Sequence, residues 1–249
     1  MNNKTFFSLS VIILVVIALG VLFATQKNST PVDGPSATTI TGDFTTFCYY
    51  AENPTLNGLR DISWTKFSIA GENSVAGEFR TIPAEKDSKM GTFIGNTGPV
   101  DESTQGRTIT ASYTSQAEGM TATEELRIQF NDQSAVALYG EMKVREDGTY
   151  DYANPEKLTP GMSMPRVDCQ TLDEKVLTDQ YIRQNLATVL GDATETVLGG
   201  AWYVTRTEIN TDADTGTVSY EDGHITGASS FSYTVADGTV TISNVQKLK

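Results

Sequence analysis

Apolar and polar residues alternate in short runs between residues 44 and 152. In residues 109–113 and 126–130 every second side chain is apolar, so each run can turn one face to a core and the other to water. Similar runs occupy residues 59–70, 75–80, 92–95 and 135–144. Turn sequences rich in Gly, Asn and Asp separate runs at residues 71–73, 131–133 and 147–148. This pattern predicts an antiparallel meander of about seven strands, either closed as a barrel, which could be lipocalin-like, or stacked as a sandwich.

The period changes near residue 171, where apolar side chains begin to recur at helical spacing. They are Leu172, Val176, Tyr181, Leu186, Val189 and Leu190. Residues 171–174 have the form of a capping box and Gly191 supplies a stop, so one helix is expected between them. Four alternating runs follow, with Asp-Gly turns at residues 222–223 and 237–238, and they cover residues 201–209, 217–220, 229–235 and 239–245. This part is therefore expected to be α+β, a helix followed by an antiparallel strand meander, as in cystatin-like folds.

The start of the chain has a third pattern, because residues 6–23 are apolar except for Ser8, Ser10 and Gly20. A helix of about 20 residues spans the roughly 30 Å hydrocarbon core of a bilayer. We therefore expect a single-pass N-terminal membrane helix, with a cleaved signal peptide as the alternative. Lys4, before the run, favours a cytoplasmic N-terminus. Both alternatives place the rest of the chain outside the cytoplasm, in the cell envelope.

These patterns divide the chain into four segments. Residues 1–27 form the expected N-terminal membrane anchor, and residues 28–43 form a flexible linker. Residues 44–170 form the antiparallel β domain, and residues 171–249 form the α+β domain. The expected fold class is mainly β with an α+β part.

Cys48 and Cys169 are the only cysteines of the chain. In an exported protein, an even and minimal cysteine count predicts a disulfide. Closing so long a loop contributes up to about 5 kcal/mol in the chain-entropy model. Two buried free thiols are the alternative.

The charge balance is acidic, with 31 Asp and Glu residues against 18 Lys and Arg residues. The expected anchor, residues 1–27, contains two lysines and no acid, so the exported part has 16 basic residues and a formal charge of −15. A surface of this sign repels phosphate backbones, which makes nucleic acid a poor partner. Solubility near an anionic cell surface is sufficient reason for the excess of acids.

Four strings of the sequence carry a resemblance to a known family. They are Pro-Ala-Glu-Lys-Asp-Ser-Lys-Met-Gly-Thr-Phe at residues 83–93, Glu-Gly-Met at 118–120 followed by Glu-Leu at 125–126, Leu-Gly-Gly-Ala-Trp-Tyr-Val at 198–204, and Val-Ser-Tyr-Glu-Asp-Gly-His-Ile at 218–225. Together they resemble an uncharacterised family of membrane-anchored secreted proteins from uncultured bacteria with small genomes. The resemblance covers roughly residues 47–245 and implies the same layout of anchor, strand-rich unit and helix plus strands. No activity is assigned to that family, so the resemblance implies no catalytic residue.

His224 is the only histidine and follows two acids, Glu221 and Asp222. A histidine beside carboxylates could act as a general base or contribute to a binding site. A zinc site would need further His or Cys ligands, and no Gly-x-Ser-x-Gly elbow occurs in the chain. The structural alternative is a hairpin turn in which Asp-Gly sets the backbone.

Asn210, Asp212, Asp214 and Glu221 fall at positions 1, 3, 5 and 12 of a twelve-residue calcium loop. The match fails at the sixth position, where Thr215 replaces the glycine that the sharp turn requires. The pattern is therefore a weak calcium candidate, and an acidic hairpin loop is the alternative.

Glu85, Lys86, Asp87 and Lys89 mix positive and negative charges between two expected strands. Loops carry binding residues more freely than cores do, so this segment is the expected contact surface. A solvated turn that neutralises its own charge is the alternative.

The motifs of cofactor chemistry are missing from the sequence, since there is no Gly-rich phosphate loop and no Cys-x-x-Cys. No cofactor is predicted. The sequence favours a non-catalytic envelope protein that binds a small ligand, a glycan or another envelope protein. The alternatives are an anchored hydrolase that uses carboxylates and a calcium-stabilised surface module.

Overall fold

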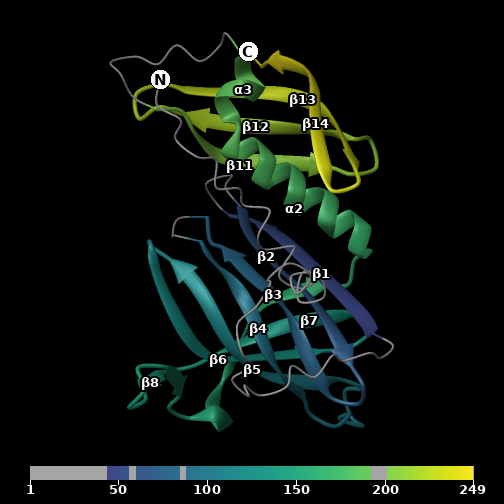
Figure 1. Cartoon of the computed structure of the whole chain (residues 1–249), viewed down its shortest axis with the longest axis vertical. Helices are drawn as coiled ribbons and strands as arrows, with labels where there is room; N and C mark the ends of the chain where they lie inside the picture. The colour runs from purple at the N-terminus through teal and green to yellow at the C-terminus, as the bar shows by residue number, and fades with distance from the viewer. Residues whose placement is uncertain (1–43, 56–59, 85–87, 192–200, 249) are drawn as a thin grey trace, which may run out of the picture. The chain divides into compact units, whose positions relative to one another are not determined.

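The computed structural model describes residues 44–55, 60–84, 88–191 and 201–248. Most of these residues lie in the strands of two sheets, and helices are few (Figure 1). The mainly β class expected from the sequence is confirmed.

The first sheet follows the order of the chain, and each strand pairs with the next. Its strands are β1 Phe44–Pro54, β2 Arg60–Ala70, β3 Ser74–Ile82, β4 Lys89–Thr97, β5 Arg107–Ala117, β6 Met120–Phe130, β7 Ser134–Tyr139 and β10 Thr159–Pro165. A small hairpin of β8 Met142–Val144 and β9 Tyr150–Tyr152 lies beside β6, and the 3-10 helix η2 Pro155–Lys157 precedes β10. The tight turns use the left-handed region, as at Gly71 (φ 57°) and Gly119 (φ 74°).

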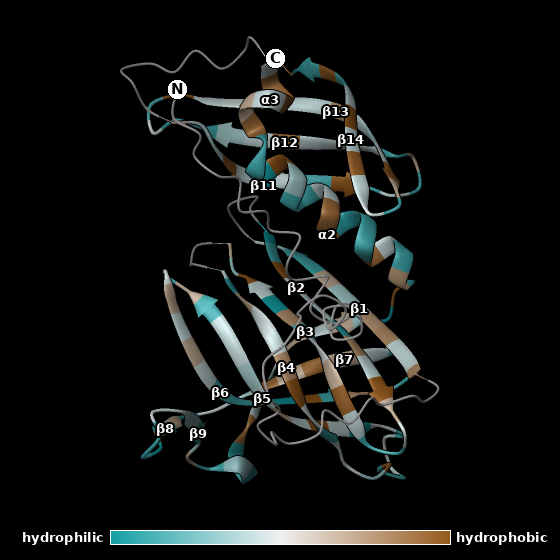
Figure 2. Cartoon of the chain, in the orientation of Figure 1, coloured by the Kyte–Doolittle hydropathy of each residue, from teal (hydrophilic) through white to brown (hydrophobic). Residues whose placement is uncertain are grey.

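The inner face of this sheet is filled with large apolar side chains. Brown segments alternate with paler ones along its strands in Figure 2. The most deeply buried of these side chains are Tyr49, Phe67, Phe79, Phe93, Ile109, Tyr113, Ile128 and Met164. The Phe67 ring lies 4.9 Å from the Phe130 ring and 5.4 Å from the Phe47 ring between centroids. Interlocking rings of this kind make a solid core.

The described strands do not close into a barrel. β1 and β10 stand at the two ends of the strand path, and an isolated bridge between Tyr49 and Arg166 joins the chain just beyond β10 to β1. β10 is poorly suited to a continuous ladder, because Pro160 and Pro165 have no N–H and its register on β7 shifts between Pro160 and Ser163. The closed-barrel alternative was therefore wrong, whereas two separate sheets are observed.

The remaining elements are two helices and a second sheet. Their bounds are α2 Cys169–Gln184, α3 Leu186–Leu190, β11 Tyr203–Asn210, β12 Thr215–Glu221, β13 Thr226–Ala236 and β14 Thr239–Lys247. The four strands form an antiparallel meander in chain order. Ile182, Leu186 and Leu190 of the helices pack against one face of it, which presents Val218, Tyr220, Phe231 and Tyr233. We call this the helix-facing face and its opposite the outer face.

Helix α2 begins three residues earlier than the sequence predicted. Its N-cap is Asp168, whose Oδ1 accepts hydrogen bonds from the backbone N–H groups of Gln170 (2.8 Å) and Thr171 (3.4 Å). The capping box expected at residues 171–174 was therefore wrong, because Asp168 already satisfies the free N–H groups of the first turn. The helix also breaks at Asn185, so two helices replace the single one expected.

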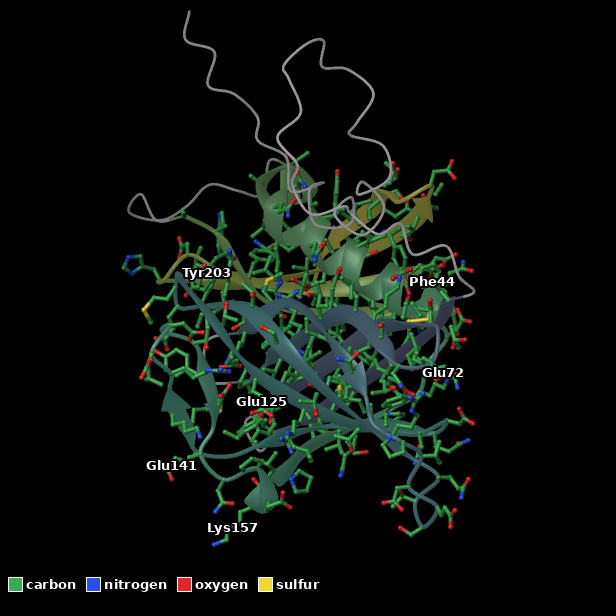
Figure 3. The ribbon with its side chains drawn as sticks, turned by 60° about the horizontal axis from the view of Figure 1, so that its bottom comes forward. Phe44, Glu72, Glu125, Glu141, Lys157 and Tyr203 are labelled. Carbon is green, nitrogen blue, oxygen red and sulfur yellow. A yellow bond between two sulfur atoms is a disulfide. The ribbon has the colours of Figure 1, made fainter. Side chains whose placement is uncertain are left out.

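The start of α2 is fixed to the outer side of the first sheet. Cys48 of β1 and Cys169 of α2 form a disulfide, with their Cα atoms 5.2 Å apart, so the predicted bridge is confirmed. It is drawn as a yellow bond in Figure 3. Cys48, Trp64 and Leu172 form a buried cluster around it. The bridge closes a sequence separation of 121 residues.

The expected membrane helix and linker, residues 1–43, lie outside the described residues. Within the described part of the chain, no helix combines the length and the apolar character that crossing a bilayer requires. The described residues all belong to one compact unit by their contacts.

Candidate functional site

A hollow of about 580 Å³ opens over the outer face of the second sheet. Val218, Tyr220 and Phe231 point to the helices, so the alternating residues between them point the other way. The side chains of the outer face that line the hollow are Glu208, Asn210, Thr215, Thr217, Ser230, Ser232, Asn244 and Gln246. We call this hollow the polar groove.

One row of polar side chains crosses the whole width of the groove. Strand pairing sets Glu208 opposite Thr217, Thr217 opposite Ser230, and Ser230 opposite Gln246. Each of the four strands therefore contributes one member. Directly opposed side chains in antiparallel strands have Cβ atoms roughly 5 Å apart, so the row is evenly spaced.

The first sheet supplies the end of the groove near Glu208. Arg60, the first residue of β2, places Nη1 3.1 Å from Glu52 Oε1 and Nη2 3.0 Å from Glu208 Oε1. Glu52 also accepts a hydrogen bond from the Tyr50 hydroxyl at 3.3 Å. Glu208 accepts from Thr217 Oγ1 at 3.1 Å and pairs with Arg206. These shared contacts bring two carboxylates and one guanidinium together at the charged end of the groove.

The floor of the groove is rich in groups that can both donate and accept hydrogen bonds. Two of their own bonds are long: Ser230 Oγ lies 3.5 Å from Gln246 O, and Asn244 Nδ2 lies 3.4 Å from Ser232 Oγ. Hydrogen bonds at such lengths are weak and are readily exchanged for shorter ones. The groove can therefore offer hydroxyl and amide groups to a polar ligand.

The predicted site around His224 is a structural turn. Asp222 is buried, and its Oδ1 accepts from the backbone N–H groups of His224 and Ile225, both at 2.9 Å. Gly223 takes the left-handed conformation, with φ 87°. Glu221 accepts a hydrogen bond from Tyr203, which is labelled in Figure 3. Glu221, Asp222 and His224 thus lie together, but Asp222 is used to hold the backbone.

The four residues of the weak calcium candidate lie at two separate places in the structure. Asn210 Oδ1 accepts from the backbone N–H of Asp212 at 3.0 Å, which shapes the turn between β11 and β12. Asp214 lies in the same turn, whereas Glu221 lies at the far end of β12, about 20 Å away at the usual rise per residue. Among the described residues, no group of three or more His, Cys, Asp or Glu side chains could hold a metal ion.

Of the charged segment predicted as a contact surface, Glu85, Lys86 and Asp87 lie outside the described residues. Lys89 forms an ion pair with Glu124 of β6, and its ammonium lies 5.8 Å from the centre of the Tyr113 ring. Burial, together with the Glu124 carboxylate, raises the pKa of Tyr152 to about 12. Lys89 therefore turns toward a tyrosine-rich end of the first sheet.

The groove residues were missed by sequence reasoning, although one signal was present. Thr217, Ser230 and Ser232 alternate with buried residues, and such a pattern also describes an ordinary solvated sheet face. Arg60 and Glu208 are 148 positions apart in the sequence. Only the fold brings them to one guanidinium–carboxylate contact.

No protein-family model matches the chain, and comparisons with curated proteins and with solved structures likewise give no match.

Proposed function

We propose that this protein is a membrane-anchored, extracytoplasmic binding module whose polar groove takes a neutral glycan of the cell envelope. The observation that carries the proposal is the row of Glu208, Thr217, Ser230 and Gln246, one polar side chain from each strand, along the floor of a hollow of about 580 Å³.

A glycan fits the chemistry of the floor better than other partner classes do. Protein interfaces have an apolar centre, whereas ten of the thirteen residues that line this groove have hydroxyl, amide or charged side chains. Nucleic acid is repelled by a chain with a net charge of −13. Sugar hydroxyls both donate and accept hydrogen bonds, as the hydroxyl and amide side chains of the groove do. A neutral glycan avoids the repulsion that an anionic glycan would meet at Glu52 and Glu208.

The proposed location follows from the first residues of the chain. The apolar run of residues 6–23 has the length and composition of a membrane helix, and residues 28–43 would hold the folded part away from the bilayer. The disulfide between Cys48 and Cys169 supports an oxidising compartment. A glycan-binding module in this place would attach its membrane to envelope or surface polysaccharide.

A hydrolase is the second candidate, because two carboxylates, Glu52 and Glu208, meet at the same end of the groove. Glycoside hydrolysis requires one carboxyl to donate a proton to the leaving group. Both carboxylates here are bound by the single Arg60 guanidinium, an arrangement that suits two anions rather than a proton donor. We therefore favour binding without turnover.

The test is a glycan array probed with the full-length chain in detergent, followed by calorimetric titration of the best neutral oligosaccharide. Thr217→Val and Ser230→Val should each weaken binding about two- to tenfold, the usual worth of one hydroxyl hydrogen bond. Thr234→Val is the matched control, because Thr234 is an exposed outer-face residue of β13 outside the groove lining. The absence of binding to every neutral glycan, or equal losses in all three variants, would refute the proposal. Release of shortened glycans that stops in Glu52→Gln and Glu208→Gln would instead identify the hydrolase.

A further inference from the structure

Lys175 lies in the second turn of α2 and contacts both strands that form the walls of the polar groove. The β11 wall carries Glu208 and Ile209, and the β1 wall carries Glu52. Its Nζ donates to the backbone oxygen of Ile209 at 2.7 Å, and Ile209 lines the groove from β11. The same Nζ lies 5.2 Å from the centre of the Tyr50 ring on β1. One ammonium group thus contacts an element of each sheet.

The contact with Tyr50 continues to the opposite wall of the groove. The Tyr50 hydroxyl donates to Glu52 Oε2 at 3.3 Å, and Glu52 Oε1 binds Arg60 at 3.1 Å. Arg60 in turn reaches Glu208 on β11 at 3.0 Å. A chain of contacts therefore runs from Lys175 through Tyr50, Glu52 and Arg60 to Glu208. Glu208 and Ile209 are neighbours on β11, so this chain of contacts begins and ends on the same strand.

Helix α2 is itself anchored on both sides of Lys175. Six residues earlier, Cys169 forms the disulfide to Cys48 on β1. Four residues later, Asp179 binds Thr207 of β11, and Arg183 donates to Val204 O at 3.2 Å. The backbone that carries Lys175 is therefore held at a defined position against both strands.

We infer that Lys175 is a positioning residue of the groove, whose ammonium holds the β11 wall against the β1 wall and thereby sets the width available to the ligand. The inference rests on the proposed glycan-binding function and names the residue that tunes it. Exposed ion pairs contribute little, so the Arg60–Glu208 contact at the rim needs this inner support. A half-buried charged donor on a backbone carbonyl makes a stronger bond than a neutral one does.

Lys175→Met tests the inference because it keeps the aliphatic stem and removes the charged donor. The affinity of the full-length chain in detergent for its best neutral oligosaccharide should fall about tenfold, the loss expected for one charge-assisted hydrogen bond. Lys66→Met is the matched control. Lys66 also joins the first sheet to α2, through Asp173 at 2.6 Å, but is not among the residues that line the groove. Wild-type affinity in Lys175→Met, or an equal loss in Lys66→Met, would overturn the inference.

A pH profile gives a readout that general loosening of the fold would not reproduce. The groups that face Lys175 are Glu52 and Tyr50 on β1, Arg60 on β2 and Asp212 in the β11–β12 turn. Burial lowers the pKa of Lys175. Wild-type affinity should therefore fall on the alkaline side as the ammonium is lost, and Lys175→Met should show no such fall. An identical alkaline fall in both proteins would count against Lys175.

A ligand-free measurement separates this inference from the proposed function. Amide relaxation dispersion of Glu208 and Ile209 should show added slow motion in Lys175→Met and none in Lys66→Met. If no neutral glycan binds the wild type, the proposed function fails, and added motion would still show that Lys175 positions the strand. If the dispersion is unchanged, Lys175 does not position the wall.

Discussion

The inner face of the first sheet and the outer face of the second sheet are both built from alternating strands, yet they are filled in opposite ways. Phe67, Phe79 and Phe93 fill the first with rings that are at most 2% exposed. Thr217, Ser230 and Ser232 line the second with short polar side chains around an open hollow. Large interlocking side chains leave no room for a ligand, whereas short polar ones leave both space and hydrogen-bonding groups. The first face therefore contributes mainly to stability, and the second is the face at which we propose binding.

Removing one ring from the first face should have the largest effect on stability. Phe67→Ala deletes a side chain that packs against four other aromatic rings, Phe47, Tyr49, Phe93 and Phe130, and should lower the free energy of unfolding by about 3–5 kcal/mol. Ser232→Ala on the second face should change it by less than about 0.5 kcal/mol. Urea denaturation of both variants measures the difference. Similar losses of unfolding free energy in Phe67→Ala and Ser232→Ala would contradict the conclusion that the first face contributes more to stability than the second.

The disulfide should rank next, because it fixes α2 to the first sheet. Replacing both Cys48 and Cys169 by alanine removes a link that closes 121 residues and should cost about 2–5 kcal/mol. The same shift in the denaturation midpoint is expected when wild-type protein is unfolded with a thiol reductant. An unchanged denaturation midpoint in both the double variant and the reduced wild type would mean that the disulfide does not stabilise the fold.

The start of α2 offers a smaller effect with an internal control. Asp168→Ala removes the side chain that caps two backbone N–H groups and should destabilise the protein by about 1 kcal/mol. Thr171→Ala, at the cap position suggested by the sequence, should leave stability nearly unchanged. Thermal unfolding followed by circular dichroism distinguishes the two. A larger loss of stability in Thr171→Ala than in Asp168→Ala would show that Thr171, as in the predicted capping box, is the true N-cap.

The smallest expected effect concerns pH. Burial raises the pKa of Glu78 above its ordinary 4.5, although the Lys66 ammonium opposes the shift and Asp173 adds to it. The folded protein therefore keeps this proton at pH values where the unfolded chain has lost it. The contribution of Glu78 to stability is present below pH 4.5 and is lost as pH rises through the folded pKa. Glu78→Gln should flatten this fall in denaturation experiments carried out from pH 4.5 upward. An unchanged slope would show that Glu78 is not the responsible group.

Local patterns in the sequence predicted much of the fold. The turns at Gly71, Asn131 and Gly148 are present, because their side chains or positive φ angles act within two or three residues. The strands of the second sheet also fall where alternation placed them. The cysteine count was enough to predict the bridge between Cys48 and Cys169. Interactions that span few residues, or that have only one possible partner, can be inferred from one chain.

Other features depend on the tertiary structure and could not be inferred. Strand β10 was missed because Pro160, Gly161 and Pro165 resemble a loop, and its pairing with β7 compensates for their poor strand preference. The cap at Asp168 was missed because Thr171 and Glu174 gave a better local match. The groove joins Arg60 to Glu208 across two sheets, and no spacing along the chain records that contact.

Mapping a neutral oligosaccharide by NMR on the full-length chain tests most directly whether the second face is the binding face. The groove predicts saturable shifts of the backbone amides of Thr217, Ser230 and Arg60, with Phe67 and Phe93 unmoved, and the shifts should weaken in Ser230→Val. Shifts that cluster instead near His224 or Lys89, or no saturable shift with any neutral glycan, would contradict the assignment of binding to the second face.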